Sequence, residues 1–435
     1  MKRTRLLLVL VLVFALFLSF APTAMAEPPY SAAAITKLLQ VPIGTEFPAM
    51  GFTFTFTPDM YNNSPDDLSR LPVIGTRVGT TGPGVITINV NSTTATFEDT
   101  VDRVSTYYVE SGNFVENVTF PNAGIYDYIV EESGTTYDIA SDLHEALELS
   151  RARYQVSIWV QETSAGVPFV YHVGVVRITT DDGDPGDEKV DPTPGGDNVD
   201  TFYSQMTFTN KYVRTNGADN PNNPNPQKPP ATDPVPGAPY TGDSTLNIGN
   251  EITGFMGSQI LPFDFSIRVD VPTLIPDYVL DFYKAYLVDS TGPIDPTGTV
   301  NASLIGTDTG GTGTRRFIRF EPGTAINFEL KHGQTLVFIN TPVGTAYNVA
   351  QTAEAGYTTT IQPFYNSVKE PLVTALAYAG LVGERFNAAN YTNDYGDEPP
   401  TGLNVNDLPF YGLILLAVGG LVIFIVIKAR KRNRG

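Results

Sequence analysis

Short runs in which aromatic and β-branched residues alternate with polar ones recur along most of the chain, and this pattern limits the fold most strongly. Clusters of Gly, Pro, Asn and Asp separate the runs. With a period of two, one face of each strand can enter a core while the other meets solvent. The pattern predicts an all-β fold built from Ig-like β-sandwiches. In the first half of the chain the runs are GFTFTFTP (51–58), GVITINV (84–90), GIYDYIVEE (124–132), YQVSIWV (154–160) and VPFVYHVGVVRITT (167–180).

A second β-rich block follows a sharp change in composition. Residues 216–242 consist mainly of Pro, Asn, Gly and other polar residues, which cannot build a core. We therefore expect one domain at residues 35–212, a linker at 213–243 and a second domain at 244–395. The runs of the second block are STLNIGNEITG (244–254), LPFDFSIRVDV (261–271), TAINFELKHGQTLVFIN (324–340), GTAYNVAQTAEAGYTTTIQP (344–363) and AGLVGERFNAANYTNDY (379–395).

The two blocks share an internal plan. Each has a strand with alternating Phe near its start, FTFTF in the first block and FDFSI in the second. Each later has a Tyr-centred strand, and each closes on an aromatic residue followed by Thr and Asn. This order predicts a tandem of two similar domains, because the repeat is too long for a solenoid.

One segment of the first block carries helical spacing. In SDLHEALELSRARY (141–154) the apolar residues Leu143, Ala146, Leu147 and Leu149 recur at intervals near 3.6, and Ser141 could cap the first turn. We expect a short amphipathic helix here, with a packing role.

Neither a metal site nor a cofactor site is expected. The segment 181–198 is rich in Asp, Gly and Pro and predicts an exposed hairpin loop, but it lacks the Asp-x-Asp-x-Asp-Gly order of a calcium loop. The three histidines, His144, His172 and His332, show no catalytic or metal-binding spacing, and no phosphate-binding or dinucleotide motif is present. The sequence therefore argues against an enzyme that turns over a substrate.

Both ends of the chain carry apolar segments. Residues 1–26 combine basic residues, an apolar run and the small-x-small pattern of Ala24-Met25-Ala26, which predicts a signal peptide followed by a short lead at 27–34. Residues 409–427 are uncharged and about long enough for a transmembrane helix, which needs ~20 apolar residues. The basic tail at 428–435 would stay on the cytoplasmic side. We expect an extracellular protein that is anchored by its C-terminus.

Charge and cysteine content narrow the partners and the means of stabilisation. The formal net charge of −19 argues against nucleic acid as a partner, because an acidic surface repels phosphate. The chain has no cysteine, so disulfides cannot stabilise the extracellular domains. Another means of stabilisation is expected.

Three motifs in the first block, in order and about a domain apart, point to that means. They are Thr36-Lys37-Leu38-Leu39, the strand from Gly124 to Glu132, and Phe208-Thr209-Asn210. The first block resembles the streptococcal-type pilin isopeptide-linkage domain, and the second resembles a collagen-adhesin B-type domain. The resemblance implies that the Lys37 amine attacks the Asn210 side-chain amide, that ammonia leaves, and that the first and last strands become covalently joined.

The chemistry of such a bond explains why a third residue is needed. A lysine is a nucleophile only when it is neutral, and burial favours the neutral form. An acid in the same dry site can hold a proton, pass it on and polarise the Asn carbonyl. Alternation places Glu132 on the face of Tyr126 and Tyr128, and Glu131 on the opposite face. We therefore predict Glu132 as the catalytic acid.

The second block departs from the family pattern at the corresponding positions. Asn250 occupies the expected Lys position and Gln351 the expected Glu position, whereas Asn393 remains. No isopeptide bond is expected in the second domain, where neutral hydrogen bonds could fill the same positions.

The segment 396–408 contains a further short motif. Glu398-Pro399-Pro400-Thr401-Gly402 resembles the sorting signals of sortase substrates, which implies cleavage between Thr401 and Gly402 and transfer to an amine. The leading Leu of the usual signal is missing, so a simple membrane-proximal turn remains the alternative reading.

The sequence favours a pilin-like structural protein of a Gram-positive cell surface, with sortase and other pilin or cell-wall components as partners. The alternative is a surface adhesin that binds a ligand through a sandwich face, the segment 141–154 or the long region 274–323. Polymerising pilins of this family resemble one another in offering a Lys just before the bonding Asn, and residues 201–209 contain none. This favours an accessory or single surface protein over a shaft subunit.

Overall fold

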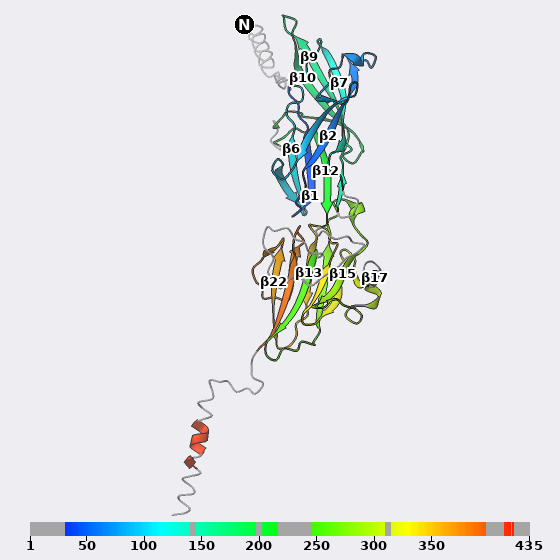
Figure 1. Ribbon diagram of the computed structural model, residues 1–435. Helices are drawn as coiled ribbons and strands as arrows, with labels where there is room; N and C mark the ends of the chain where they lie inside the picture. Colours follow the sequence, from blue (N-terminus) through cyan, green and yellow to red (C-terminus); the bar gives the residue numbers. More distant parts are fainter. Residues whose placement is uncertain are drawn as a thin grey trace, which may run out of the picture. The chain divides into compact units, whose positions relative to one another are not determined.

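The computed structural model describes residues 31–139, 145–196, 202–215, 245–308, 315–396, 413–418 and 420–421. The regular secondary structure of these residues is almost entirely β-strand, so the predicted all-β class is confirmed (Figure 1). The chain divides into two compact units. The first contains the chain up to Thr215 together with Pro272–Leu280 and Pro342–Gly344, and the second contains Asn216–Val271, Asp281–Thr341 and Thr345–Gly435.

The first unit contains two sheets that enclose one core. The smaller sheet has the strand order β5-β6-β1-β12-β8, and the larger has the order β11-β10-β9-β7-β2-β4-β3. A short 3-10 helix, η1 (Leu68–Arg70), lies between β2 and β3. The strands are β1 (Thr36–Pro42), β2 (Met50–Tyr61), β3 (Thr76–Arg77), β4 (Gly84–Val90), β5 (Thr96–Val101), β6 (Val104–Glu110), β7 (Gly124–Thr135), β8 (Glu145–Glu148), β9 (Arg153–Glu162), β10 (Pro168–Thr179), β11 (Pro185–Val190) and β12 (Thr207–Arg214).

The second unit also contains two sheets. One has the order β17-β18-β15-β20-β13-β25-β22-β23 with β16 paired to β15, and the other has the order β19-β14-β21-β24. The 3-10 helix η3 (Ala302–Leu304) belongs to this unit, whereas η2 (Pro276–Tyr278) lies in the segment Pro272–Leu280 of the first unit. The strands are β13 (Leu246–Thr253), β14 (Phe263–Asp270), β15 (Tyr283–Asp289), β16 (Gly292–Pro293), β17 (Ile305–Asp308), β18 (Arg315–Phe320), β19 (Ile326–Leu330), β20 (Gln334–Phe338), β21 (Ala346–Gln351), β22 (Tyr357–Tyr365), β23 (Val368–Lys369), β24 (Ala377–Leu381) and β25 (Ala388–Tyr395).

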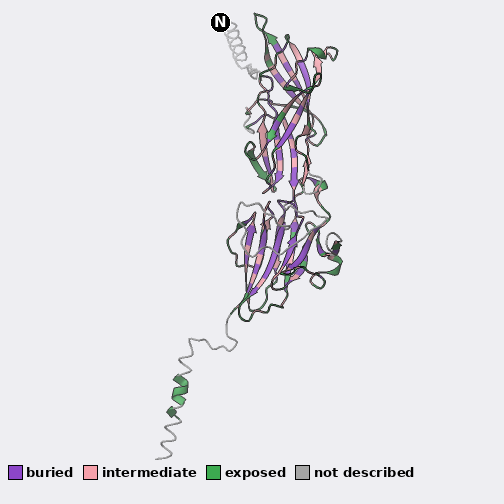
Figure 2. Cartoon of the chain, in the orientation of Figure 1, coloured by how far each residue is buried: buried purple, intermediate pink, exposed green. Residues whose placement is uncertain are grey.

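Alternation along the strands builds both cores, as the runs predict. In β2 the side chains of Phe52, Phe54 and Phe56 are buried, and the Thr residues between them are only partly buried. The strands of Figure 2 accordingly carry buried and more exposed positions in turn. In each unit the opening strand lies beside the closing strand in parallel, β1 beside β12 and β13 beside β25. The first and last strands of each domain are therefore adjacent, and the chain enters and leaves at opposite ends of this pair.

The helix expected at 141–154 is wrong for the described residues 145–154, and residues 141–144 lie outside the described part of the chain. Residues 145–148 form strand β8, which pairs with Lys211–Arg214 of β12, and Arg153 already belongs to β9. The side chain of Glu145 accepts hydrogen bonds from the hydroxyls of Tyr137 and Tyr212. Pairing with the free edge of β12 and these two contacts outweigh a helical spacing that only a few apolar residues support.

The acidic segment 181–198 is only partly a loop. A tight turn spans residues 180–184, and Pro185–Val190 then forms β11, which pairs with β10. Consecutive acidic residues at an edge strand remain solvated, so composition alone could not separate this strand from a loop.

Several predicted segments lie wholly or partly outside the described residues. These are the signal peptide, most of the linker and the sorting signal Glu398–Gly402. Strand β12 runs to Arg214, slightly past the predicted start of the linker. Within the predicted span at 409–427, residues 413–418 and 420–421 are helical. Among the described residues, no helix combines the length and the apolar character needed to cross a bilayer.

Candidate cross-linking site

Lys37 and Asn210 come together because β1 and β12 are parallel neighbours. In this pair Lys37 aligns with Phe208, and Leu39 aligns with Asn210. Side chains two residues apart on a strand share a face, so Lys37 and Asn210 both point into the core. Both are fully buried, with 0% of each residue exposed.

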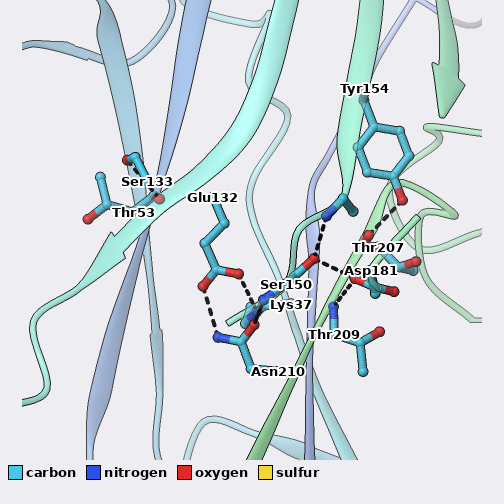
Figure 3. A network of polar contacts seen from close by, with 11 residues as sticks. Lys37, Thr53, Glu132, Ser133, Ser150, Tyr154, Asp181, Thr207, Thr209 and Asn210 are labelled. Atoms are coloured by element: carbon cyan, nitrogen blue, oxygen red, sulfur yellow. Dashed lines mark hydrogen bonds and ion pairs between the residues drawn. The ribbon is translucent and has the colours of Figure 1, made fainter. Parts of the chain in front are cut away.

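Glu132 enters the same space from the opposite sheet. Its Oε2 atom lies 3.0 Å from Lys37 Nζ, and its Oε1 atom accepts a hydrogen bond of 2.9 Å from Asn210 Nδ2. Figure 3 shows the three side chains pointing toward one another from their separate strands. The Glu132 side chain is fully buried, whereas that of Glu131 is 45% exposed and pairs with Arg153 at 3.2 Å. The structure thus brings together the three residues that the motifs select.

The surroundings of Lys37 favour its neutral form. Burial lowers the pKa of its ammonium from 10.5 to about 8, although the nearby Glu132 carboxylate acts in the opposite direction. Its Nζ atom also lies 4.7 Å from the ring centre of Phe52, and this cation–π contact, like Glu132, favours the charged form. The lowered pKa makes the neutral, nucleophilic amine easier to reach than in an exposed lysine.

The amide of Asn210 has a defined orientation. Its Oδ1 atom accepts a hydrogen bond of 2.7 Å from the backbone N–H of Ser150. A backbone N–H can only donate, so this contact assigns the oxygen to that side and turns Nδ2 toward Glu132. The sequence analysis expects the acid to polarise the Asn carbonyl; in the structure Glu132 contacts the leaving nitrogen, and Ser150 contacts the carbonyl oxygen.

Asp181 supports this side of the site and is absent from the sequence motifs. Its Oδ1 atom accepts a hydrogen bond of 2.8 Å from the backbone N–H of Thr209, and it also accepts one from the Ser150 hydroxyl (Figure 3). Neither Ser150 nor Asp181 could be selected from sequence. Any residue except Pro offers a backbone N–H, so the sequence does not mark Ser150 as a donor. Asp181 is one of several acidic residues in the segment 181–198, and nothing in the sequence distinguishes it from the others.

The second unit assembles Asn250, Gln351 and Asn393 in the corresponding place. Asn393 Nδ2 donates to Asn250 Oδ1 at 2.8 Å and to Gln351 Oε1 at 3.0 Å. Gln351 Nε2 donates to Asn393 Oδ1 at 2.8 Å, and the Thr359 hydroxyl donates to the same oxygen at 2.6 Å. All four residues are buried. The cluster is held by neutral amides and contains no ionisable nucleophile.

The register of the two clusters is the same. Asn250 aligns with Tyr391, two residues before Asn393, as Lys37 aligns with Phe208, two residues before Asn210. The third member also corresponds, because Gln351 pairs with Phe265 on β14. In the first unit Glu132 pairs with Phe54 on β2.

Among the described residues, no group of His, Asp and Glu side chains could hold a metal ion. The described histidines lie apart: His172 contacts the ring of Trp159, and His332 lies beside Glu251. His144 and the sorting signal fall outside the described part of the chain.

Comparison with known proteins gives a family match and several similar structures. A family described as a domain of unknown function (DUF7601) matches residues 244–375. No curated protein matches the chain.

Several similar solved structures are of pilus proteins. The major pilin from Streptococcus pyogenes is 15% identical over 83% of this chain and 98% of its own, with a TM-score of 0.31. A second major pilin from this species, T3.2, is also 15% identical, over 85% of this chain and 100% of its own, with a TM-score of 0.28. A pilus-presented adhesin, Cpa, is 14% identical over 57% of this chain and 37% of its own, with a TM-score of 0.22.

Proposed function

We propose that the first unit forms an intramolecular amide bond between Lys37 Nζ and Asn210 Cγ, with Glu132 carrying the protons. On this basis the chain is a pilin-like structural protein of the cell surface. The observation that supports the proposal is that one buried carboxylate contacts both the nucleophile and the leaving group, at 3.0 Å and 2.9 Å. A structural ion pair would need only the first of these contacts.

The reaction balances with the groups present. The Lys37 ammonium gives a proton to Glu132 Oε2, and the neutral amine attacks Cγ of Asn210. Glu132 then protonates Nδ2, the bond from Cγ to Nδ2 breaks, and the nitrogen leaves as ammonia. The new amide keeps one of the original ammonium protons, and the second proton lost from Lys37 leaves with the ammonia as ammonium. Glu132 ends as the carboxylate with which it began.

The fold supplies the alignment that the reaction needs. Both reacting groups are fixed by strand pairing and by the aromatic rings around them, such as Phe208, whose ring lies 4.8 Å from that of Phe54. Holding two groups in reactive contact replaces an encounter from solution and can lower the activation free energy by ~7 to 11 kcal/mol. A slow amide exchange thereby becomes feasible without an external catalyst.

Peptide mapping tests the bond directly. Tandem mass spectrometry of a proteolytic digest is expected to reveal a branched peptide in which the segment around Lys37 is joined to the segment around Asn210. Recovery of these segments only as separate linear peptides would contradict the proposal.

Anchoring and assembly belong to the same proposal. The sorting motif at Glu398–Gly402 and the apolar segment 409–427 support attachment by sortase or by the membrane. SDS-resistant multimers on native cells would indicate a pilus shaft. A single band would favour an accessory or single surface protein, as expected from the absence of Lys in residues 201–209.

One observation favours the adhesin alternative. A cleft of about 550 Å³ lies on the second unit between the loop at 298–301 and the strands β14, β19 and β21, and Asp264, Asn301 and Glu329 are among its lining residues. Its size is within the range of small-ligand sites, and its lining includes polar side chains. Loss of cell adhesion in the Asp264→Ala/Glu329→Ala variant, with the cross-link intact, would support this function, and unchanged adhesion would oppose it.

A further inference from the structure

The contact between Ser150 and Asn210 has a chemical consequence beyond orienting the amide. Ser150 lies between β8 and β9, is only 6% exposed, and places its N–H 2.7 Å from Asn210 Oδ1. When the amine attacks Cγ, negative charge develops on this oxygen. A buried donor that already points at the oxygen stabilises the charge without reorganisation.

We propose that the backbone N–H of Ser150 stabilises the oxyanion on Asn210 during bond formation, and that Asp181 is the residue that positions it. This inference rests on the proposed cross-link and assigns a role to the turn at 180–184, which composition alone presents as a solvated loop.

Asp181 connects the two segments that must stay in register. Through Oδ1 it accepts hydrogen bonds from the Thr209 N–H, one residue before the reacting Asn, and from the Ser150 hydroxyl. Its main-chain oxygen accepts a third bond, 3.0 Å long, from the Arg151 N–H. The hydroxyl oxygen of Ser150 in turn accepts a hydrogen bond of 3.1 Å from the Ala152 N–H. Asp181 thus fixes the donor segment 150–152 against the strand that carries Asn210.

The charge of Asp181 acts on the reaction in the opposite direction. Its carboxylate helps to raise the pKa of Lys37, which burial otherwise lowers, and so favours the unreactive ammonium. If Asp181 influenced the site only through its charge, removing it would leave the reaction unchanged or accelerate it. If it positions the Ser150 N–H, removing it slows the reaction. The two roles therefore predict effects of opposite sign.

A pulse–chase experiment on the full chain separates them. The chain is synthesised in a cell-free reaction with detergent, and samples are quenched at intervals. They are boiled in SDS and separated on gels, where the linked form migrates faster because it stays more compact. The variants are Ser150→Pro, which removes the N–H, and Asp181→Ala and Asp181→Asn. The matched control is Asp182→Ala, since the Asp182 side chain is 76% exposed and pairs with Lys211 at 3.6 Å.

The expected results follow from the hydrogen bonds. Ser150→Pro lowers the rate constant by about 100-fold or more, the usual effect of losing one oxyanion donor. Asp181→Ala lowers it by about tenfold, because the donor loses its alignment. Asp181→Asn stays within about threefold of the unmodified chain, since an amide oxygen can still accept from Thr209 and Ser150. Asp182→Ala reacts like the unmodified chain.

Other outcomes overturn the inference. A protease-resistant, folded Ser150→Pro chain that reacts at the normal rate excludes the oxyanion role. If Ser150→Pro does not fold, the variants Asp181→Ala and Asp181→Asn decide. Positioning by hydrogen bonds is excluded if Asp181→Ala reacts as fast as the unmodified chain or faster. It is also excluded if both variants react equally slowly. These results leave the proposed function intact. That proposal fails separately if the unmodified chain never forms the faster band.

Discussion

Lys37 and Asn210 lie on adjacent parallel strands, offset by two residues, and both side chains reach the same carboxylate. Since these strands are the first and last of the unit, a bond between the two residues encloses nearly the whole domain. Tension applied at the two ends of the domain would then pass through the covalent bond. In a chain without cysteines, this arrangement can take the place of a disulfide.

The cross-link should make a large contribution to stability. By analogy with a disulfide that closes a loop of about 100 residues or more, we expect Asn210→Ala to lower the free energy of unfolding of the first unit by about 4 to 5 kcal/mol. Denaturant titration of both chains measures the difference. Equal stability of the unmodified and Asn210→Ala chains would show that no constraint had been removed.

The two neighbouring glutamates should behave differently. Glu132→Gln removes the proton carrier and should abolish bond formation, whereas Glu131→Gln changes only an exposed side chain paired with Arg153 and should leave the reaction intact. Gel mobility after boiling in SDS distinguishes linked from unlinked chains. Full linkage in Glu132→Gln, or its loss in Glu131→Gln, would reverse the assignment of the catalytic acid.

The reaction should slow at alkaline pH. The reactive state holds one proton that Lys37 and Glu132 share, and the buried Lys37 has a pKa of about 8 instead of 10.5. Above this value the pair loses the shared proton, and Glu132 can no longer protonate the leaving nitrogen. Pulse–chase rates should therefore be nearly constant just below about pH 8 and fall above it. A rate that keeps rising through this range would mean that deprotonation of Lys37 alone limits the reaction.

The second unit should become reactive when both missing partners are supplied. Because Asn250, Gln351 and Asn393 have the same register as the first site, Asn250→Lys with Gln351→Glu should release a second ammonia. Each single substitution buries a charge without its partner and should instead destabilise the unit, by about 3 to 5 kcal/mol. Mass spectrometry counts the ammonia lost. A folded double variant with no additional loss would show that the register is insufficient.

Strand alternation and the motifs predicted much of the fold and the centre of the site. The runs around Phe54, Tyr128 and Phe265 lie in strands at the expected positions, because burying one face of a sheet requires a period of two. The same alternation separated Glu132 from Glu131. These features depend on local sequence, which is why they could be predicted.

The remaining features depend on contacts between distant segments. Residues 145–148 form a strand because they pair with the edge of β12. This tertiary contact cannot be predicted from the helical spacing of the segment. The role of Ser150 rests on its backbone, so its side chain gives no signal. Asp181 differs from Asp182 only in where the turn directs its side chain. In each case the contact depends on three-dimensional position and not on residue type.

The most direct test is the intact mass of the purified, folded protein, compared with the mass calculated from its sequence. We predict a deficit of one ammonia that disappears in Lys37→Ala and in Glu132→Ala. A mass without any deficit would contradict the cross-link, and a deficit of two would contradict the assignment of the second unit as unreactive.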